Sequence, residues 1–548
     1  MDTVVGSRLR RHAPLALVLV VGAALRLYPV HLPYVGVDTQ EVYPRAAVLA
    51  VAEGHWRSRW IAHGPGFFDA LRAMYSVWYG VGRVAGLHQD RLDLLATFVA
   101  RPLPFIVGGR VLVVACALLA LVLIARLGRD LGAPAGGLAG AALLAVTFSN
   151  VRESHQVWPD VPAGTLTLAA IAASVVALRD RRIRWVVAAG ALGGFAIATK
   201  LSTFPVALPV ALGAFCSQGR LTARAARALA AGLAAVGAYV IASPYTLLAF
   251  QTARQFMTDQ WHLTVGPSHG ALPLGRLVVL GIGLPLTLLG GAGLVMAARR
   301  RPLSAWLVVA AFPIAYAVVL LASTRLFVRY LVLLIPFVAL FAGYAVTELA
   351  RAIVPRHAGP AAALVVLVLA ARPVMLAVEY DRFLAREDTR SLAGAWLAEH
   401  AAADAWVTIP EPTGYVNPIL PPNDLELRRR YPGEAVQLRR RLASAFRGWT
   451  VAYLASFEQI ARLQPRQHFV VTSAHPALFG HLSTPFRVVA AIQQAGGRPV
   501  ARFVGAPDPL APEVCYDPID ADYVPLRGWN ALVRPGPNLT IWQLPGRD

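Results

Sequence analysis

The sequence has 548 residues and a single lysine, Lys200, so 50 of its 51 basic residues are arginine. A chain with so strong an arginine bias retains an occasional lysine by chance, and the existence of one lysine therefore carries no functional meaning. Its position is different, because Lys200 ends the apolar stretch "GGFAIATK" (193–200). A lone ammonium at the end of an apolar segment is the feature that needs an explanation.

Charge is scarce as well. Charged residues make up 15% of the chain and hydrophobic residues 57%, whereas soluble globular proteins average roughly 25% charged residues. This balance excludes an ordinary soluble domain, and the long apolar runs between residues 13 and 378 indicate a polytopic α-helical membrane protein. The formal net charge of +21 would suit a nucleic-acid partner in a soluble protein. In a membrane protein the excess is expected in cytoplasmic loops, so no nucleic-acid partner is predicted.

Cysteine is the third rare residue, with three copies in the chain. Cys116 and Cys216 fall in apolar runs, and Cys515 lies near the C-terminus. Their spacing matches neither a metal site nor a disulfide framework. No metal ligands are therefore assigned, no cofactor is predicted to be required, and no divalent metal is indicated.

The apolar runs predict about eleven transmembrane helices. The N-terminal arginines precede an apolar run without a small-residue cleavage site, which favours a first span over a removed signal peptide. The predicted spans lie at 13–30, 110–127, 134–149, 161–178, 186–199, 203–217, 229–245, 273–297, 303–322, 330–350 and 359–378.

Arginine distribution sets the predicted orientation. Alternate connections, such as "RLGRD", "RDRRIR" and "RLTARAAR", carry two or more arginines each, while the intervening short connections carry few. The positive-inside rule then places the N-terminus in the cytoplasm. The plasma (inner) membrane is the expected location. It also divides residues 186–217 into two short spans, because one long kinked helix would put "RLTARAAR" outside.

Two regions are predicted to lie outside the membrane. The loop 31–109 is too long to be a connector, and its near-helical spacing of apolar residues predicts helices on the membrane surface. An odd number of spans also places residues 379–548 outside. That tail contains an amphipathic helix and the strand-like stretches "AWVTIP", "HFVVTSA", "RPVARFVG" and "LTIWQLP", which predict a small α+β domain. The predicted domains are therefore 1–378 and 379–548.

Ionisable residues gather where the spans meet the outer surface. Lys200 ends a span of about 14 residues, or roughly 21 Å, so it is expected to lie recessed below the surface of a core near 30 Å thick. Charge at such depth is costly unless it faces a polar cavity or a partner. One outward-facing cavity accounts for the whole set. Its candidate residues are Asp38, Glu41, His63, Arg152, His155, Asp160, Lys200, His262, Arg325 and Arg329.

Each candidate also has a structural interpretation. Asp160 precedes Pro162 and could be only the N-cap of the next helix. Lys200, Arg325 and Arg329 could be anchors that reach the interface, and single histidines are more often structural than catalytic. Taken together, a carboxylate and several cations at a lipid–water boundary suit an anionic lipid substrate. Cations would hold its phosphate, and a carboxylate would take a proton from an acceptor.

The order of motifs resembles the C-type membrane glycosyltransferases that use polyprenyl-phosphate sugars, in the branch of the protein O-mannosyltransferases and the lipid A aminoarabinose transferases. The resemblance covers about residues 34–397, and the tail is similar mainly in its ending "VRPGPNLTIWQLP". The matching stretches include "YVGVDTQEVYPRAAVLAVAEGHW", "IAHGPGFFDALRAMY", "VRESHQVWPDVPAG", "GGFAIATKLSTFPVALP", "FVRYLVLLIPFVAL" and "DTRSLAGAWL".

The resemblance implies roles for individual residues. Asp38 matches the general base of the first outer loop, and Asp160 matches a second acid that helps the site. Lys200 and Arg329 match basic residues near the donor phosphate, while Arg110 matches a structural arginine. The family often has an Asp-Glu pair in the first loop, but here Thr39 follows Asp38. This departure leaves open whether Glu41 substitutes for the pair and whether a metal binds.

The predicted activity is inverting transfer of a hexosyl or pentosyl group from a polyprenyl-phosphate sugar to a glycan, lipid or protein acceptor. Asp38 would deprotonate the acceptor, and Lys200 and Arg329 would stabilise the departing phosphate. Two other classes stay open: a transporter of a lipid-linked substrate, and a catalytically inactive homologue that binds in the same cavity. The sequence names neither the sugar nor the acceptor.

Overall fold

The structure is a computed structural model. It describes residues 2–32, 37–54, 64–180, 182–217, 219–264, 271–299, 303–324, 326–410, 416–456, 467–474, 483–508, 511–517 and 525–546. The chain divides into two compact units. Unit 1 comprises Met1–Val30, His55–Ala73 and Val107–Val378, and unit 2 comprises His31–Gly54, Met74–Ile106 and Glu379–Asp548. Residues 379–548 thus fall in unit 2 together with most of the first outer loop.

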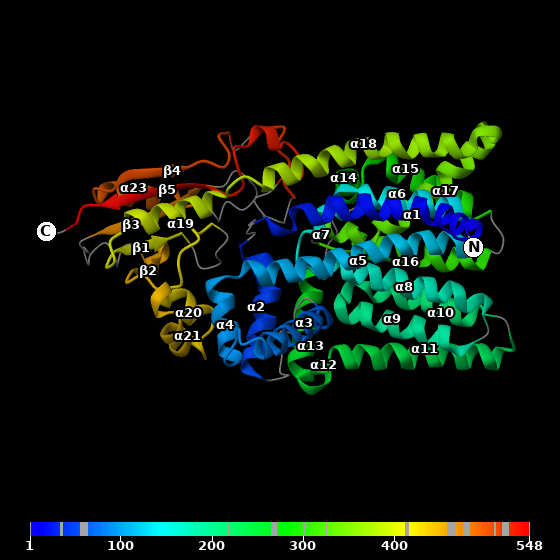
Figure 1. Cartoon of the computed structure of the whole chain (residues 1–548), viewed down its shortest axis with the longest axis horizontal. Coiled ribbons are helices and arrows are strands. Elements are labelled where there is room, and N and C mark those ends of the chain that lie inside the picture. Colours follow the sequence, from blue (N-terminus) through cyan, green and yellow to red (C-terminus); the bar gives the residue numbers. More distant parts are fainter. Residues whose placement is uncertain are drawn as a thin grey trace. The chain divides into compact units, whose positions relative to one another are not determined.

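Unit 1 is a bundle of apolar helices that run side by side (Figure 1). Seven helices of the described chain are long and apolar enough to cross a membrane, and nine if each of two bent pairs counts as one span. Their bounds are α1 Asp2–Leu27, α5 Leu103–Asp130, α6 Pro134–Val146, α7 Phe148–Ser154, α8 Asp160–Arg179, α11 Leu221–Ala242, α14 Ala271–Gly281, α15 Leu284–Ala297, α16 Leu303–Leu321, α17 Ile335–Ile353 and α18 Ala358–Leu384.

The other two predicted spans are short apolar helices, α9 (Ile183–Thr199) and α10 (Ala207–Phe215). A 3-10 turn, η2 (Leu201–Val206), joins them after Lys200. A Cβ built on Gly193 of α9 would meet Val206 and Val210, so the chain turns back on itself at Lys200. The predicted division of 186–217 into two short helices is thus what the structure contains.

Two glycines allow α9 to pack closely against α11. A Cβ on Gly190 or on Gly194 would lie 2.1 Å from the carbonyl oxygen of Ala231 or Ala235, respectively. No real side chain tolerates such a distance, so these positions need glycine for the two backbones to approach. Small residues at this spacing are a common device for close helix packing in membranes.

The bent pair of α6 and α7 is held by a buried arginine. The two helices meet at an angle of 60°, and the break leaves carbonyl groups at the end of α6 without helical partners. Arg26 of α1 donates to the carbonyl oxygens of Leu144 and Ala145 at 3.4 and 2.7 Å. It also donates to Asn150 Oδ1 and Ser154 Oγ of α7. One guanidinium therefore donates hydrogen bonds to the carbonyl groups that the break leaves unpaired, and it also connects α7 to α1.

The remaining helices of unit 1 connect these spans. They are α12 Tyr245–Leu248, α13 Phe250–Thr264 and the 3-10 segments η3 Val328–Leu333 and η4 Pro355–His357. The first outer loop contains α2 Val37–Glu53, α3 Pro65–Val84 and α4 Arg91–Ala100, preceded by η1 Tyr28–His31. Helices were predicted in this loop, and they are present.

Within unit 2, aromatic side chains pack between the helices of the first outer loop. Trp78 stacks on Phe105 with ring centroids 5.1 Å apart, and Phe98 packs edge-on against Phe105 at 5.4 Å. The Tyr75 hydroxyl donates to the Phe105 carbonyl oxygen at 2.8 Å. These contacts give α4 a buried face that includes Leu94 and Leu95.

The C-terminal region is the predicted α+β fold. It contains one five-stranded sheet of order β2-β1-β3-β5-β4, in which β1 pairs in parallel with β2 and β3, while β5 pairs antiparallel with β3 and β4. Four strands fall on the predicted stretches, and β2 was not predicted. The bounds are β1 Trp406–Ile409, β2 Thr450–Tyr453, β3 His468–Ala474, β4 Arg498–Phe503 and β5 Asn538–Leu544, with helices α19 Thr389–His400, α20 Asp424–Arg430, α21 Ala435–Arg441 and α23 Phe486–Gln494 and 3-10 turns η5 Ala443–Ala445, η6 Leu454–Ser456 and η7 Trp529–Ala531.

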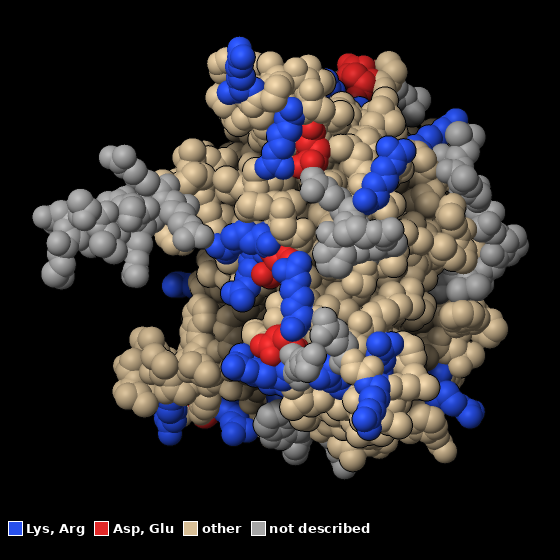
Figure 2. Space-filling model, turned by 90° about the vertical axis from the view of Figure 1, so that its right-hand side faces the viewer, with Lys and Arg blue, Asp and Glu red and all other residues tan. Residues whose placement is uncertain are grey.

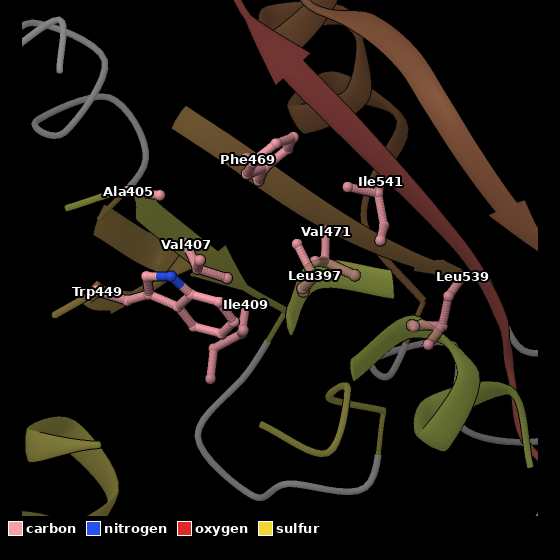
Figure 3. Close-up of a cluster of buried hydrophobic side chains, with 10 residues drawn as sticks. Leu397, Ala405, Val407, Ile409, Trp449, Phe469, Val471, Leu539 and Ile541 are labelled. Carbon is pink, nitrogen blue, oxygen red and sulfur yellow. The ribbon is translucent and has the colours of Figure 1, made fainter. Parts of the chain in front are cut away.

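Apolar side chains of α19 and the central strands form the core of this domain. Figure 3 shows Val407, Val471 and Ile541 from three neighbouring strands close to Leu397 of α19. Trp449, just before β2, closes one side of the cluster. Val470, Trp542 and Leu544 of the sheet belong to a second buried cluster with Ile492 of α23. The strands therefore bury apolar residues on both faces, one against α19 and the other against α23.

A buried ion pair begins α19. Arg390 is fully buried and donates from Nε and Nη2 to the two carboxylate oxygens of Asp388, at 2.8 and 2.6 Å. Thr389 Oγ1 donates to the carbonyl oxygen of Pro537 at 2.7 Å. Gly536, with φ +98°, lets the chain pass beside Asp388 where a Cβ would clash. The stretches "DTRSLAGAWL" and "VRPGPNLTIWQLP" are thus in contact.

Candidate functional site

Lys200 makes an ion pair at the turn between α9 and η2. Its Nζ atom lies 2.6 Å from Asp160 Oδ1, and the side chains are 15% and 1% exposed. Both residues are held by helix ends, since Asp160 begins α8 and Lys200 follows the last residue of α9. The structure brings together two of the predicted site residues that are 40 positions apart.

Asp160 is not the cap of its helix. Pro159 occupies the N-cap position, and no side chain caps α8 there. The carboxylate is in the first turn, where the helix dipole favours negative charge, and it accepts the hydrogen bond from Lys200. Its second oxygen, Oδ2, is buried and accepts no hydrogen bond from the described residues. The side chain is therefore aimed at the lysine rather than used for capping.

Aromatic rings hold the neighbouring cations. The Arg329 guanidinium lies between the rings of Trp158 and Phe327, with its Cζ atom 4.4 and 4.5 Å from their centroids. The Lys200 Nζ atom lies 4.8 Å from the Tyr330 ring centroid. A guanidinium stacked on its faces is oriented by the rings and points its N–H groups outward along its edge. Such an arrangement is suited to an oxyanion.

Further charges lie close by. Arg152 and Glu153 of α7 form a buried pair at 2.6 Å, and Glu153 and Arg329 both interact electrostatically with Lys200. Lys200, Arg152 and Arg329 are three cations, and Asp160 and Glu153 are two carboxylates, so these five described residues carry one net positive charge. An excess cation in a buried cluster favours an anionic ligand.

The start of α3 lies against this cluster. Gly64 has φ +99°, and a Cβ there would lie 1.8 Å from the carbonyl oxygen of Thr199. A Cβ on Gly66 would be 3.0 Å from the Ala198 carbonyl carbon. The glycines of "HGPG" (63–66) therefore let the first outer loop touch the end of α9, one residue before Lys200.

The other candidates have more varied positions. Arg110 donates to the Val30 carbonyl oxygen at 2.9 Å and is buried, as the predicted structural role requires. His155 is buried, and its Nε2 lies 3.1 Å from the Leu25 carbonyl oxygen, beside the Arg26 network. His262 is exposed on α13.

Several candidates lie outside the described residues. His63 and Arg325 are not described, and for Asp38 and Glu41 only the helical backbone of α2 is described. Among the described residues, no three His, Cys, Asp or Glu side chains gather as a metal site would. The described site therefore consists of Asp160, Lys200, Arg329 and their neighbours.

The sequence model of the family described as dolichyl-phosphate-mannose-protein mannosyltransferase matches residues 106–251. The structure of ArnT from Cupriavidus metallidurans bound to undecaprenyl phosphate matches at 14% identity with a TM-score of 0.56, over 98% of this chain and 99% of that chain. Its apo structure gives 14% identity and a TM-score of 0.54, over 96% and 99%. This chain has the ArnT fold.

The resemblance predicted from the motifs is thereby confirmed, and the ArnT fold is that of a polytopic membrane protein. The oligosaccharyltransferase AglB from Archaeoglobus fulgidus, in complex with an inhibitory peptide and a dolichol-phosphate, also matches at 14% identity with a TM-score of 0.47. That match covers 72% of this chain and 58% of AglB, so the chain spans little more than half of AglB. A search of the curated proteins gives no match.

The ArnT-like bundle has an arginine-rich end opposite the site. α8 begins at Asp160 and ends at Arg179, and its 20 residues correspond to a length of about 30 Å. Figure 2 shows this far end, where basic side chains surround a few acidic ones. The basic side chains near the ends of these helices include Arg126, Arg129, Arg179, Arg182, Arg184, Arg220, Arg224, Arg299, Arg351 and Arg356.

Several residues in and around the site were not predicted from the sequence. Arg26, Trp158, Phe327 and Tyr330 contribute through contacts that no local pattern specifies. Arg26 had one available signal, because an arginine near the end of an apolar span needs an internal partner or a route to the interface. The two glycines of "HGPG" also carried a signal, since closely spaced glycines mark close backbone approach.

Proposed function

We propose that this protein is a membrane glycosyltransferase that moves a sugar from a polyprenyl phosphate to an acceptor at the extracytoplasmic face. The observation that carries the proposal is the Lys200–Asp160 pair beside Arg329, at the end of the 17-residue apolar helix α9. This cluster has an excess of one cation, which suits the phosphate of a lipid donor.

The comparisons support the donor class. The matched family is described by a dolichyl-phosphate-linked mannose donor, and the ArnT structure of the same fold contains undecaprenyl phosphate. The arginine-rich end in Figure 2 supports an orientation with that end in the cytoplasm. The N-terminus would then be cytoplasmic, and the site would open to the opposite side of the plasma (inner) membrane.

The proposed reaction is direct displacement with inversion. Asp38, in the first turn of α2, takes the proton of the acceptor hydroxyl or amine. The acceptor atom forms a bond to the anomeric carbon as the bond from that carbon to the phosphate oxygen breaks. The electron pair leaves with the polyprenyl phosphate, whose growing charge Lys200 and Arg329 stabilise.

Asp160 has a supporting role in this scheme. Its carboxylate holds the Lys200 ammonium at 2.6 Å, so the flexible lysine side chain is ordered before the donor arrives. Two of the three ammonium hydrogens are then available for phosphate oxygens. Arg329, whose guanidinium lies against the rings of Trp158 and Phe327, adds a second cation to the phosphate site. Arg325 is assigned to the same phosphate group by its place in "STRLFVRY".

Incubation of the purified protein in lipid nanodiscs with radiolabelled polyprenyl-phosphate sugars and a membrane extract tests the proposal. Labelled product is expected with the wild type and absent with Asp38→Asn, while binding of the labelled lipid is retained. Glu53→Gln, at the other end of α2, is the matched control and is expected to behave as the wild type. Wild-type turnover in Asp38→Asn would remove the assignment of the base.

A further inference from the structure

Unit 2 contains an ion-pair network that joins the C-terminal domain to the first outer loop. Arg441, the last residue of α21, contacts Asp90 Oδ2 through Nη2 and Asp93 Oδ1 through Nη1. One guanidinium thus bridges two carboxylates that are about 350 positions away in the sequence. The sequence analysis assigned no role to any of the three residues.

Both carboxylates also begin α4. Asp90 is the N-cap and accepts from the Asp93 N–H at 2.9 Å, while Asp93 Oδ2 accepts from the Gln89 N–H at 2.8 Å. The arrangement is similar to a capping box, except that the Asp93 carboxylate accepts from the amide one residue before the N-cap. Arg441 therefore contacts the two side chains that set the start of α4.

α4 in turn packs against α2. Both α21 and α2 have contacts with α4 within unit 2, and Figure 1 shows the three helices as neighbours. The buried faces are apolar, with Leu94 and Leu95 on α4 and Tyr43 and Val48 on α2. A shift of α4 would therefore be passed to α2, whose first turn contains Asp38.

We propose that Arg441 is a positioning residue: it couples the C-terminal domain to α4 and, through α4, sets the placement of α2 and of Asp38. The C-terminal domain then acts as the support of the catalytic loop. This inference rests on the proposed function for its effect on transfer, whereas the coupling itself does not depend on it.

The charges of the network persist over the neutral pH range. Desolvation acts to raise the pKa of Asp90, but hydrogen bonds from the Asp93 N–H and from Arg441 outweigh it and lower that pKa. Arg441 is 31% exposed, Asp90 50% and Asp93 26%. Exposed pairs are weak and screened by salt, so this network suits holding a position rather than stabilising the fold.

Hydrogen exchange of the full chain in nanodiscs tests the coupling directly. In Arg441→Gln, amides of 37–54 and 91–100 are expected to exchange about three- to five-fold faster than in the wild type, as loss of exposed ion pairs predicts. Amides of β4 are expected to be unchanged. Arg440→Gln is the matched control, because Arg440 is adjacent and exposed and makes no ion pair among the described residues.

Asp90→Asn separates the ion pair from the helix cap. Asparagine is as good an N-cap as aspartate, so α4 keeps its start while the carboxylate is lost. Asp90→Asn is expected to speed exchange as Arg441→Gln does, and the double variant is expected to add little to either. Three results would overturn the coupling. They are unchanged exchange of residues 37–54 and 91–100 in Arg441→Gln, equally fast exchange in Arg440→Gln, and a double variant whose effect is the full sum of the two single effects.

Transfer assays then test the effect on the site. Arg441→Gln is expected to lower kcat about three- to ten-fold with the donor KM unchanged, because the change acts on the loop that contains Asp38 and on none of the residues assigned to the donor phosphate. High salt is expected to bring the wild type toward the variant. Faster exchange in Arg441→Gln with an unchanged kcat would overturn the positioning role. If Arg441→Gln exchanges faster but the wild type transfers no sugar, the proposed function alone is overturned and the coupling stands.

Discussion

At the scale of single residues, buried charge in this protein is matched by specific partners. Lys200 has Asp160, Arg152 has Glu153, and Arg390 has both oxygens of Asp388. Removing one partner of such a pair typically costs about 3–5 kcal/mol, whereas replacing both with apolar residues is often neutral. This difference offers a way to separate structural roles from catalytic ones.

Lys200→Met is expected to lower the free energy of unfolding by about 3 kcal/mol, because it leaves the Asp160 carboxylate buried and unpaired. The double variant Lys200→Met/Asp160→Leu is expected to recover most of that loss but to remain inactive in transfer. Thermal unfolding in one detergent and the radiolabel assay measure the two effects. A stable double variant that still transfers sugar would show that the pair has only a structural role.

Lys200→Arg keeps the charge and is expected to retain stability with at least ten-fold lower turnover, since a planar fork cannot take the geometry of an ammonium at 2.6 Å from Asp160. Full activity would mean that any positive charge suffices at this position.

His468 is the residue for which pH should matter. Burial lowers its pKa to about 4, whereas an unfolded histidine titrates near 6.5. Between these values the unfolded chain binds the proton and the folded domain does not. The free energy of unfolding is therefore expected to be level above about pH 6.5 and to fall as the pH drops toward 4.

Protection factors of the β3 amides at pH 7.5, 6.0 and 4.5, corrected for intrinsic exchange, measure this effect. His468→Gln cannot titrate and can still bond to Thr408, whose Oγ1 lies 2.7 Å from His468 Nε2, so it is expected to flatten the dependence. An equal dependence in the variant would assign the effect to other groups.

At the scale of elements, the breaks in helices are as informative as the helices. The α6–α7 bend works because Arg26 takes over the carbonyls that the bend releases. The α14–α15 pair bends by 104° at a glycine, Gly283, with φ +93°. The α6–α7 break is thus stabilised by a side chain from another helix, whereas the α14–α15 break uses the backbone conformations open to glycine.

Arg26→Met is expected to destabilise the protein by about 2–4 kcal/mol, because it leaves the carbonyls of Leu144 and Ala145 buried without donors. Arg126→Met, which removes an exposed pair with Asp130 at 3.8 Å, is the control and is expected to change stability by less than about 1 kcal/mol. Thermal unfolding in one detergent compares them. Similar shifts for both would contradict the role of Arg26.

At the scale of the whole molecule, the apolar pattern predicted the spans well because hydropathy and the spacing of arginines act locally along the chain. The fold class, the short helices around Lys200 and four of the five strands followed from it. The strand β2, only four residues long, was missed because its pattern is too short to stand out. The contacts of Arg329 with Trp158, of Lys200 with Tyr330 and of Arg441 with Asp90 and Asp93 were missed because they join residues that are distant in sequence.

The predicted orientation can be tested by labelling single cysteines, one native and one introduced. Cys216 is exposed beside the arginine-rich connection that precedes α11, and Gly433→Cys would place a thiol in open space on the C-terminal domain. In a background lacking the other cysteines, a membrane-impermeant maleimide is expected to label Gly433→Cys in spheroplasts and Cys216 only after lysis. The reverse pattern would invert the topology.

The close packing of Gly190 and Gly194 of α9 against α11 limits how α9 can move during turnover. A slide of α9 by one helical turn would put Val186 or Ala198 where Gly190 or Gly194 now meets a carbonyl oxygen at 2.1 Å from a Cβ position. Such one-turn shifts are a known way for packed helices to switch state, and here they are sterically closed. α9 is therefore fixed in register against α11, and a one-turn slide of Lys200 relative to α11 is excluded. A change in the depth of the Lys200 ammonium would require α9 and α11 to move together.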